Sequence, residues 1–392
     1  MNPFLETFIY ISYYILIIIL IVAGAVYINQ NIDNLPFGMG TFGISNHESF
    51  LEGNTNETTP TECQKLQRKY VTGPNFAPID SSEHRKMPLR NFMVKTAYNV
   101  VSPDTSLTGA VNSCSLDTCF HQGFRCLDFE VFEALDNNER LKAVVGMSED
   151  DLVKETPTAI QKPQDTVSIS SLATEDLDVV LANIANKGFS SICPCPSDPL
   201  ILHMRIRGNN TALATKIVES IESNIKDRLL SVNYGFGAEN VNGQIGNVPV
   251  CDLTNKIVLI FNGYEMNLVD TPLHEFSNGY SNSENIRYLN SSHISSDDTE
   301  ELKQFNKYQM SFVYPYEFKD YDYGNAKMRG CQMIGVNFAT KDTSIKKFID
   351  SYNNFFEITG HSFALKHSSL RERKQTSINP KRVNDKYFQF EV

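Results

Sequence analysis

Apolar and polar positions divide the chain into an apolar N-terminal run, a polar stretch and a long region of short alternating runs. Residues 8–28 (FIYISYYILIIILIVAGAVYI) contain no charged side chain. At about 1.5 Å per residue, a helix of this length can cross a bilayer. Residues 30–87 are rich in Gly, Asn, Thr and Pro and show little periodicity, which indicates a flexible stalk.

The apolar run has two interpretations. Ala23-Gly24-Ala25 resembles a signal-peptidase site, but the run is longer than the usual core of a signal peptide, and no basic residue precedes it. We therefore expect an uncleaved single-pass membrane anchor over residues 1–29. Its orientation stays open, because the positive-inside rule depends on Lys and Arg near the ends of the span, and neither flank carries any.

From about residue 90, short runs typical of strands alternate with helical patterns. The strand-like runs are 92–97, 125–132, 142–147, 200–206, 256–262, 285–291, 309–315 and 331–338. Apolar residues at helical spacing predict helices over 213–229 and 345–356. Eight strands with helical crossovers predict an α/β fold, a closed (β/α)8 TIM-type barrel, although an open doubly wound sheet would give much the same pattern.

Charge and cysteine content narrow the class of protein. A formal net charge of −11 argues against a general nucleic-acid binder, because phosphates require Lys and Arg partners. Eight cysteines are too few for a disulfide scaffold in a chain of this length. Cys114 and Cys119 could pair in an oxidising space, but the disulfide states of Cys63, Cys114, Cys119, Cys193 and Cys195 all stay open. The basic stretch 371–386 either contacts anionic lipid headgroups or is a solvated tail.

The Asn- and Ser-rich composition has two consequences. Asn56, Asn209 and Asn290 begin matches to the N-glycosylation sequon, and in such a chain these matches are mostly chance. An Asn-, Ile- and Ser-rich protein also suits an AT-rich genome, such as that of a large DNA virus, which would place the anchor in a viral or host endomembrane.

A series of motifs in fixed order resembles one enzyme family. FRCLDFEVF (124–132) resembles the second barrel strand of eukaryotic phosphoinositide-specific phospholipase C, and NFMVKTAYNVV (91–101) resembles the first. Later family motifs are matched by PLILHMRIRGN (199–209), NKYQMSFVYP (306–315), RGCQMIGVNFAT (329–340) and HSFALKHSSLR (361–371). The resemblance implies an X half of the catalytic barrel over 88–263, an acidic linker over 264–300, a Y half over 301–371 and a basic tail over 372–392.

The resemblance also implies a calcium site. In the family, the inositol hydroxyl of the substrate attacks the phosphodiester, and calcium lowers the pKa of that hydroxyl. The calcium ligands fall on Asn99, Asp128, Glu130 and Arg205. Residues i and i+2 of a strand share a face, so both carboxylates would point at one ion. A cation replaces the fourth ligand, which implies a vestigial site.

Other family positions have changed as well. The two catalytic histidines fall on Tyr98 and Val145, with His203 as a potential substitute on the face of Arg205. The phosphate-binding positions fall on Ile260, Asn262 and Phe312. Tyr314, which matches the residue that stacks on the inositol ring, is kept and is expected to bind substrate. Losing several well-placed electrostatic donors together leaves little catalysis, because each is commonly worth a factor of ~10²–10³.

We therefore interpret the chain as a membrane-anchored phospholipase C-like protein, catalytically inactive, that acts as a structural or interaction module at a membrane. The alternative is a divergent calcium-dependent phosphoinositide phosphodiesterase that produces diacylglycerol and inositol phosphate. The first hypothesis expects no cofactor and the second expects calcium. Expected partners are the lipid bilayer, an anionic phospholipid and an unidentified protein, but no nucleic acid. We also predict that Arg205 forms a salt bridge with Asp128, Glu130 or both.

Overall fold

The computed structural model describes residues 59–79, 82–101, 112–136, 138–147, 174–239, 241, 243–264, 266–295, 299–315, 323–339 and 343–372. The chain divides into two units, residues 1–54 and 55–392, and every described residue belongs to the second. The expected anchor (1–29), the stalk up to residue 58 and the basic tail beyond residue 372 lie outside the described residues. Within the described part, no helix is both long and apolar enough to cross a membrane.

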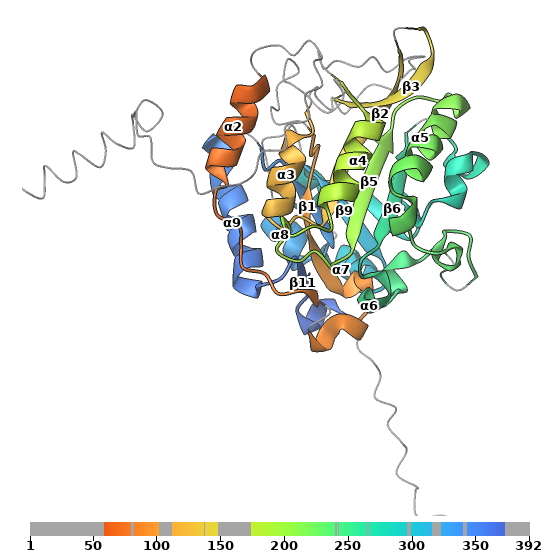
Figure 1. The fold of residues 1–392 in the computed structure, drawn as a ribbon. Helices are drawn as coiled ribbons and strands as arrows, with labels where there is room; N and C mark the ends of the chain where they lie inside the picture. The colour runs from red at the N-terminus through yellow and green to blue at the C-terminus, as the bar shows by residue number, and fades with distance from the viewer. Residues whose placement is uncertain are drawn as a thin grey trace, which may run out of the picture. The chain divides into compact units, whose positions relative to one another are not determined.

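Helices and strands alternate along the second unit (Figure 1). The α-helices are α2 (Thr59–Lys69), α3 (Cys114–His121), α4 (Leu177–Lys187), α5 (Thr211–Asn224), α6 (Val250–Leu253), α7 (Thr299–Tyr308), α8 (Tyr323–Met328) and α9 (Thr343–Thr359). The strands are β1 (Phe92–Ala97), β2 (Cys126–Leu135), β3 (Leu141–Gly146), β4 (Glu175–Asp176), β5 (Leu200–Ile206), β6 (Ile257–Gly263), β7 (Gly279–Tyr280), β8 (Ile286–Asn290), β9 (Met310–Tyr314), β10 (Met333–Val336) and β11 (Phe363–Leu365).

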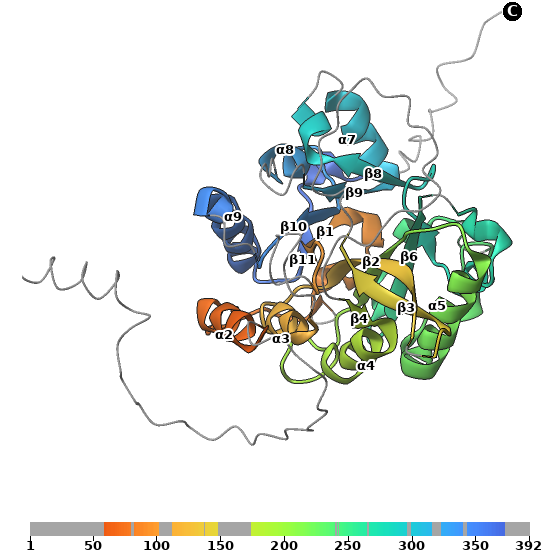
Figure 2. The same ribbon diagram turned by 90° about the horizontal axis from the view of Figure 1, so that it is seen from above.

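Eight parallel strands form the wall of a nearly closed barrel. Their order is β7-β6-β5-β2-β1-β10-β9-β8, and each neighbouring pair is parallel. The end strands β7 and β8 lie side by side, since a Cβ added to Gly279 would come within 2.8 Å of Ile286 Cδ1. Figure 2 shows α4, α5 and α9 outside the ring of strands. The TIM-type α/β barrel expected from the sequence is therefore confirmed.

Successive side chains of each wall strand point to opposite faces of the sheet, so one set forms a core inside the barrel and the other forms a core outside it. Apolar side chains inside the barrel include those of Phe92, Val94, Cys126, Ile201, Val258, Ile260, Ile286, Met310, Phe312 and Met333. Side chains on the opposite faces, such as Met93 and Met204, pack in a second cluster with Ile217 of α5 and Tyr352 of α9. A polar side chain on an inward position of these strands therefore lies within the barrel.

One predicted strand lies outside the barrel wall, and one wall strand was not predicted. Residues 141–146 form β3, but β3 pairs antiparallel with β2 and is not part of the wall. The eighth wall strand is β7, which has only two residues and pairs parallel with β6. An apolar run does not reveal the direction in which its strand pairs, and two residues leave no periodic pattern. Both β7 and β8 fall within 264–300, the segment expected to link the halves.

The two predicted helices are α5 and α9, which confirms both predictions. α5 begins after Asn210, whose Oδ1 accepts a hydrogen bond from the Ala212 N–H at 2.9 Å. Leu213 and Ile217 of this helix are buried against the barrel. The helix ends at Asn224, earlier than the predicted residue 229, and a 3-10 helix over Lys226–Arg228 continues the chain.

One disulfide joins the first described helix to the barrel. Cys63 of α2 pairs with Cys114 of α3, and their Cα atoms lie 6.0 Å apart. Cys119 is free and buried, so the pairing of Cys114 with Cys119, which the sequence left open, is not formed. Residues five apart on one helix point to different sides of it, which prevents that pairing.

Candidate functional site

A cluster of buried charged side chains lies at the carboxyl ends of the wall strands, where barrels of this class carry their sites. Asp128 and Glu130 come from β2, and His203 and Arg205 come from β5; each is 0% exposed. The two strands are neighbours, with Asp128 opposite His203 and Glu130 opposite Arg205. These positions continue the inward faces of Cys126 and Ile201, so all four side chains lie within the barrel mouth.

The Arg205 guanidinium bonds to every other expected calcium ligand. Its Nε lies 3.1 Å from Asp128 Oδ1, its Nη2 lies 3.0 Å from Asp128 Oδ2, and its Nη1 lies 2.9 Å from Glu130 Oε1. Nη2 also donates to Asn99 Oδ1. The Tyr98 ring covers the guanidinium, with its centroid 4.5 Å from Cζ. The predicted salt bridge is therefore confirmed, and it involves both carboxylates.

Asn99 reaches this cluster through an unusual backbone conformation. Its φ of 47° lies in the left-handed region, which asparagine tolerates better than most residues. The Asn99 N–H donates to Asp128 Oδ2 at 3.2 Å, and the side chain is 3% exposed. Asn99 therefore contacts Asp128 through its backbone and Arg205 through its side chain.

A second guanidinium, which the sequence reasoning missed, completes the cluster. Arg207 Nε and Nη2 lie 2.7 Å and 2.5 Å from Glu130 Oε1. The Arg207 guanidinium also stacks on Tyr264, with Cζ 3.6 Å from the ring centroid. His203, Arg205 and Arg207 are spaced two residues apart, so they lie on the same face of the strand. This spacing could have revealed Arg207 from the sequence. Two carboxylates and two guanidinium groups leave this cluster without net charge.

His203 connects the cluster to a third wall strand. Its Nδ1 lies 2.6 Å from Asp128 Oδ1, and its Nε2 lies 2.8 Å from the Oγ of Ser281, which follows β7. Burial acts to raise the pKa of Asp128, but the Arg205 charge and the bonds from His203 and Arg205 outweigh it and hold that pKa below its usual range. An ionised carboxylate only accepts, so Nδ1 donates to Asp128 and Nε2 of a neutral ring accepts from Ser281.

The environment of His203 favours the neutral ring. Burial lowers the pKa of His203, and the Arg205 charge lowers it further, against the opposing effect of Asp128. Phe312 stacks on the imidazole with ring centroids 4.2 Å apart. Serine, histidine and carboxylate occur in this order in serine hydrolases. Here Ser281 is 5% exposed and His203 is 0% exposed, so we interpret the three residues as a packed hydrogen-bonded chain.

The two positions expected for catalytic histidines are not brought together. Tyr98 is 1% exposed and packs over Arg205 in the mouth. Val145 pairs with Val131 on β2 and belongs to the outer core. The residue of β3 that pairs with Glu130 is Gly146, which has no side chain. The mapping of the second histidine onto Val145 therefore places it on the face away from the cluster.

The remaining expected positions line the inside of the barrel. Ile260 and Phe312 belong to the inner core, so neither can bind a phosphate through a charge. Asn262 pairs in register with Arg205 and is 4% exposed; among the described residues, its Nδ2 has no hydrogen-bond partner. Tyr314 stacks on Tyr288, with ring centroids 4.4 Å apart and planes 18° apart.

The donor set of this cluster does not fit calcium. Calcium takes six to eight oxygen ligands, and two carboxylates with an amide would supply part of such a shell. Both Asp128 oxygens and Oε1 of Glu130 already accept bonds from guanidinium groups, and the Asn99 amide oxygen accepts another. A divalent cation would also meet the Arg205 charge at the centre of its ligands.

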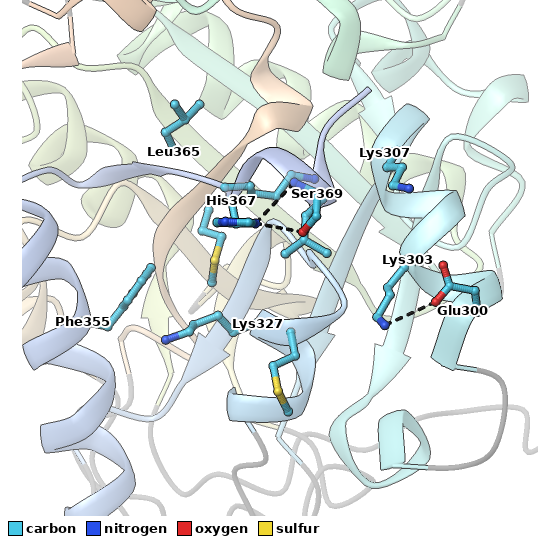
Figure 3. Close-up of a pocket in the computed structure, with 12 residues that line it drawn as sticks. Glu300, Lys303, Lys307, Lys327, Phe355, Leu365, His367 and Ser369 are labelled. Atoms are coloured by element: carbon cyan, nitrogen blue, oxygen red, sulfur yellow. Dashed lines mark hydrogen bonds and ion pairs between the residues drawn. The ribbon is translucent and has the colours of Figure 1, made fainter. Parts of the chain in front are cut away.

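A separate cavity of about 470 Å³ opens near the amino end of β1. Its wall includes Lys303 and Lys307 of α7, Lys327 of α8 and Phe355 of α9 (Figure 3). Figure 3 also shows His367 bonded to Ser369 at its edge. None of the residues that the resemblance assigns to the calcium, catalytic, phosphate or inositol positions lines this cavity, so the candidate site remains the cluster in the mouth.

The solved structures of two PLC21 proteins are similar to this fold. PLC21 of S. officinalis matches with a TM-score of 0.55 and 15% identity, over 76% of this chain and 40% of its own length. PLC21 of L. pealei matches with a TM-score of 0.51 and 13% identity over the same shares. A calcium-dependent phosphoinositol-specific phospholipase C from Pseudomonas sp. gives a TM-score of 0.41 and 12% identity, over 68% and 95%.

No protein-family model matches the sequence, and no curated protein matches it at a significant level. The chain spans 40% of the length of the two PLC21 proteins. The fold of its barrel is therefore similar to the barrel fold of the phosphoinositide phospholipase C structures, at low sequence identity.

Proposed function

We propose that this protein is a membrane-anchored, phospholipase C-like module that has lost phosphodiester chemistry and serves a structural or interaction role at a membrane. The observation that carries the proposal is the position of the Arg205 guanidinium, bonded to Asn99, Asp128 and Glu130. These are the residues that the family resemblance assigns to calcium.

A fixed guanidinium cannot replace calcium chemically. A metal ion works by binding the attacking hydroxyl and lowering its pKa, which needs an open coordination position. The Nε, Nη1 and Nη2 of Arg205 are each bonded to protein oxygens, and Tyr98 covers the guanidinium plane. This arrangement supplies charge balance for Asp128 and Glu130 and leaves a substrate hydroxyl without an activating ion.

Proton transfer lacks suitable groups as well. A general base must lie within hydrogen-bond reach of the substrate proton. His203 is the only described histidine bonded to the cluster, and both of its nitrogens are engaged with Asp128 and Ser281. Of the two family histidine positions, Tyr98 packs on Arg205 and Val145 belongs to the outer core. The proposal therefore expects no cofactor and no turnover.

Inositol phosphate release from phosphoinositide vesicles, measured with calcium and with a chelator, tests this proposal. We expect release at the level of vesicles alone in both conditions. Release above that level would contradict the proposal. If calcium stimulated the release and the isosteric Asp128→Asn variant abolished it while still melting cooperatively, the alternative of a divergent calcium-dependent phosphodiesterase would replace it.

Membrane attachment has its own test. The uncharged run 8–28 is long enough to span a bilayer, so the full chain should stay in the membrane pellet after carbonate extraction. Deleting residues 1–29 should release the protein into the supernatant. A mature N-terminus at Val26 would instead show cleavage after the small residues and contradict the anchor.

A further inference from the structure

The Cys63–Cys114 disulfide points to an oxidising environment. Disulfides persist in secretory and extracellular compartments and are reduced in the cytosol. Both paired cysteines are partly exposed, whereas among the free cysteines only Cys251 is more than slightly exposed. The cysteines nearest the surface are thus mostly protected by pairing, as a chain that folds in an oxidising space requires.

Two N-glycosylation sequons lie among the described residues, and their surroundings differ sharply. Asn290 is 5% exposed and ends β8, opposite Tyr314. Its Oδ1 accepts bonds from the Ser292 N–H at 2.9 Å and from the Ser292 hydroxyl at 2.8 Å. A bulky carbohydrate requires an exposed amide, so Asn290 is unsuitable.

Asn209, in contrast, is exposed. It lies in the loop between β5 and α5, and both Asn209 and the sequon hydroxyl residue Thr211 are exposed. The preceding Gly208 has a φ of +118°, and a Cβ added there would meet no atom within 4 Å. The loop therefore projects into open space with its acceptor amide accessible.

We propose that Asn209 carries an N-linked glycan and that the barrel lies on the lumenal or extracellular side of its membrane. The inference is independent of whether the barrel is catalytically active. Asn209 follows Arg207 by two residues, so the carbohydrate stands at the rim of the barrel mouth. A hydrated glycan at this rim would oppose close approach of a flat bilayer to the mouth.

The test is glycosidase digestion of the full chain expressed in eukaryotic cells. An Asn56→Gln background removes the sequon that lies outside the described residues. In that background we expect one glycan, released by peptide N-glycosidase, that both Asn209→Gln and Thr211→Ala eliminate. Asn290→Gln is the matched control and should leave the glycan in place. Melting temperatures of the variants verify that each is folded.

Two results would overturn the inference. The first is a chain with no glycan at Asn209 although the Cys63–Cys114 disulfide has formed. The second is a glycan that Asn290→Gln removes and Asn209→Gln retains. Loss of hydrolysis, or its presence, would leave these outcomes unchanged, so this test is separate from that of the proposed function.

Discussion

The guanidinium of Arg205 and the carboxylate of Asp128 form two parallel hydrogen bonds, with Nε 3.1 Å from Oδ1 and Nη2 3.0 Å from Oδ2. Two such bonds fix the guanidinium plane. The remaining nitrogen, Nη1, then points at Glu130 Oε1, 2.9 Å away. Arg205 thereby bridges two carboxylates of β2 that would otherwise repel each other, and Arg207 balances the remaining charge on Glu130.

Removing Arg205 should strongly destabilise the barrel. Arg205→Ala leaves Asp128 with no buried cation, and Glu130 keeps only Arg207. Breaking a buried pair from one side costs about 3–5 kcal/mol. Chemical denaturation should show this loss in the free energy of unfolding. Arg140→Ala, which removes a 74% exposed partner of Asp136, is the matched control and should have little effect. Equal losses in the two variants would contradict the role of Arg205.

Replacing Arg205 by a carboxylate should create a response to calcium. Arg205→Glu supplies the fourth ligand that the family resemblance implies, beside Asn99, Asp128 and Glu130. Calcium at 100 times its dissociation constant would then stabilise the fold by about 2.7 kcal/mol, seen as a rise in melting temperature. Arg205→Gln removes the same charge without adding a ligand and should show no rise. A similar calcium response in both variants would argue against a site at this position.

Acid should weaken the fold in two stages. The folded pKa of His203 is lowered from 6.5, so the unfolded chain binds more protons and stability falls as pH drops below about 6.5. The folded pKa of Asp128 is lowered from 3.8, so its contribution is lost below about pH 3.8. Each group adds at most about 1.4 kcal/mol per pH unit.

His203→Gln keeps a donor near Asp128 and removes the first stage. Its free energy of unfolding should therefore vary less between pH 6.5 and pH 5 than that of the native chain. His367→Gln changes an exposed histidine and serves as the control. An unchanged pH slope in His203→Gln would show that this histidine does not titrate as proposed.

The disulfide should contribute measurably to stability. Cys63 and Cys114 are 51 residues apart, and closing a loop of this size typically stabilises by about 2–4 kcal/mol. We expect the double variant Cys63→Ser/Cys114→Ser to lose stability in that range, whereas Cys251→Ser should lose little. Peptide mapping of the unreduced protein should recover the 63–114 link. A link between Cys114 and Cys119 would contradict the structure.

The family resemblance, together with strand alternation, predicted the centre of the site. The i, i+2 spacing places Asp128 and Glu130 on one face, and the resemblance assigns Arg205 to the fourth ligand position beside them, which predicted the ion pair. Most wall strands were predictable from the sequence because their short runs contain four or more apolar residues.

Other features depend on pairings that a single sequence does not encode. β3 and the wall strands have similar apolar patterns, and only the register with β2 shows that Val145 faces outward. Ser281 contacts His203 because it follows β7, which pairs with β6. With only two residues in a polar segment, β7 leaves no pattern in the sequence that predicts this contact. The Cys63–Cys114 link joins helices that are distant along the chain, and its partner choice follows from how α2 packs beside α3.

Calorimetric titration of the native chain with calcium tests most directly whether Arg205 has taken the place of the ion. We predict no saturable heat of binding, because the oxygens of Asn99 and Asp128 and Oε1 of Glu130 already accept bonds from guanidinium groups. Saturable calcium binding to the native chain that Asp128→Asn abolishes would contradict the account.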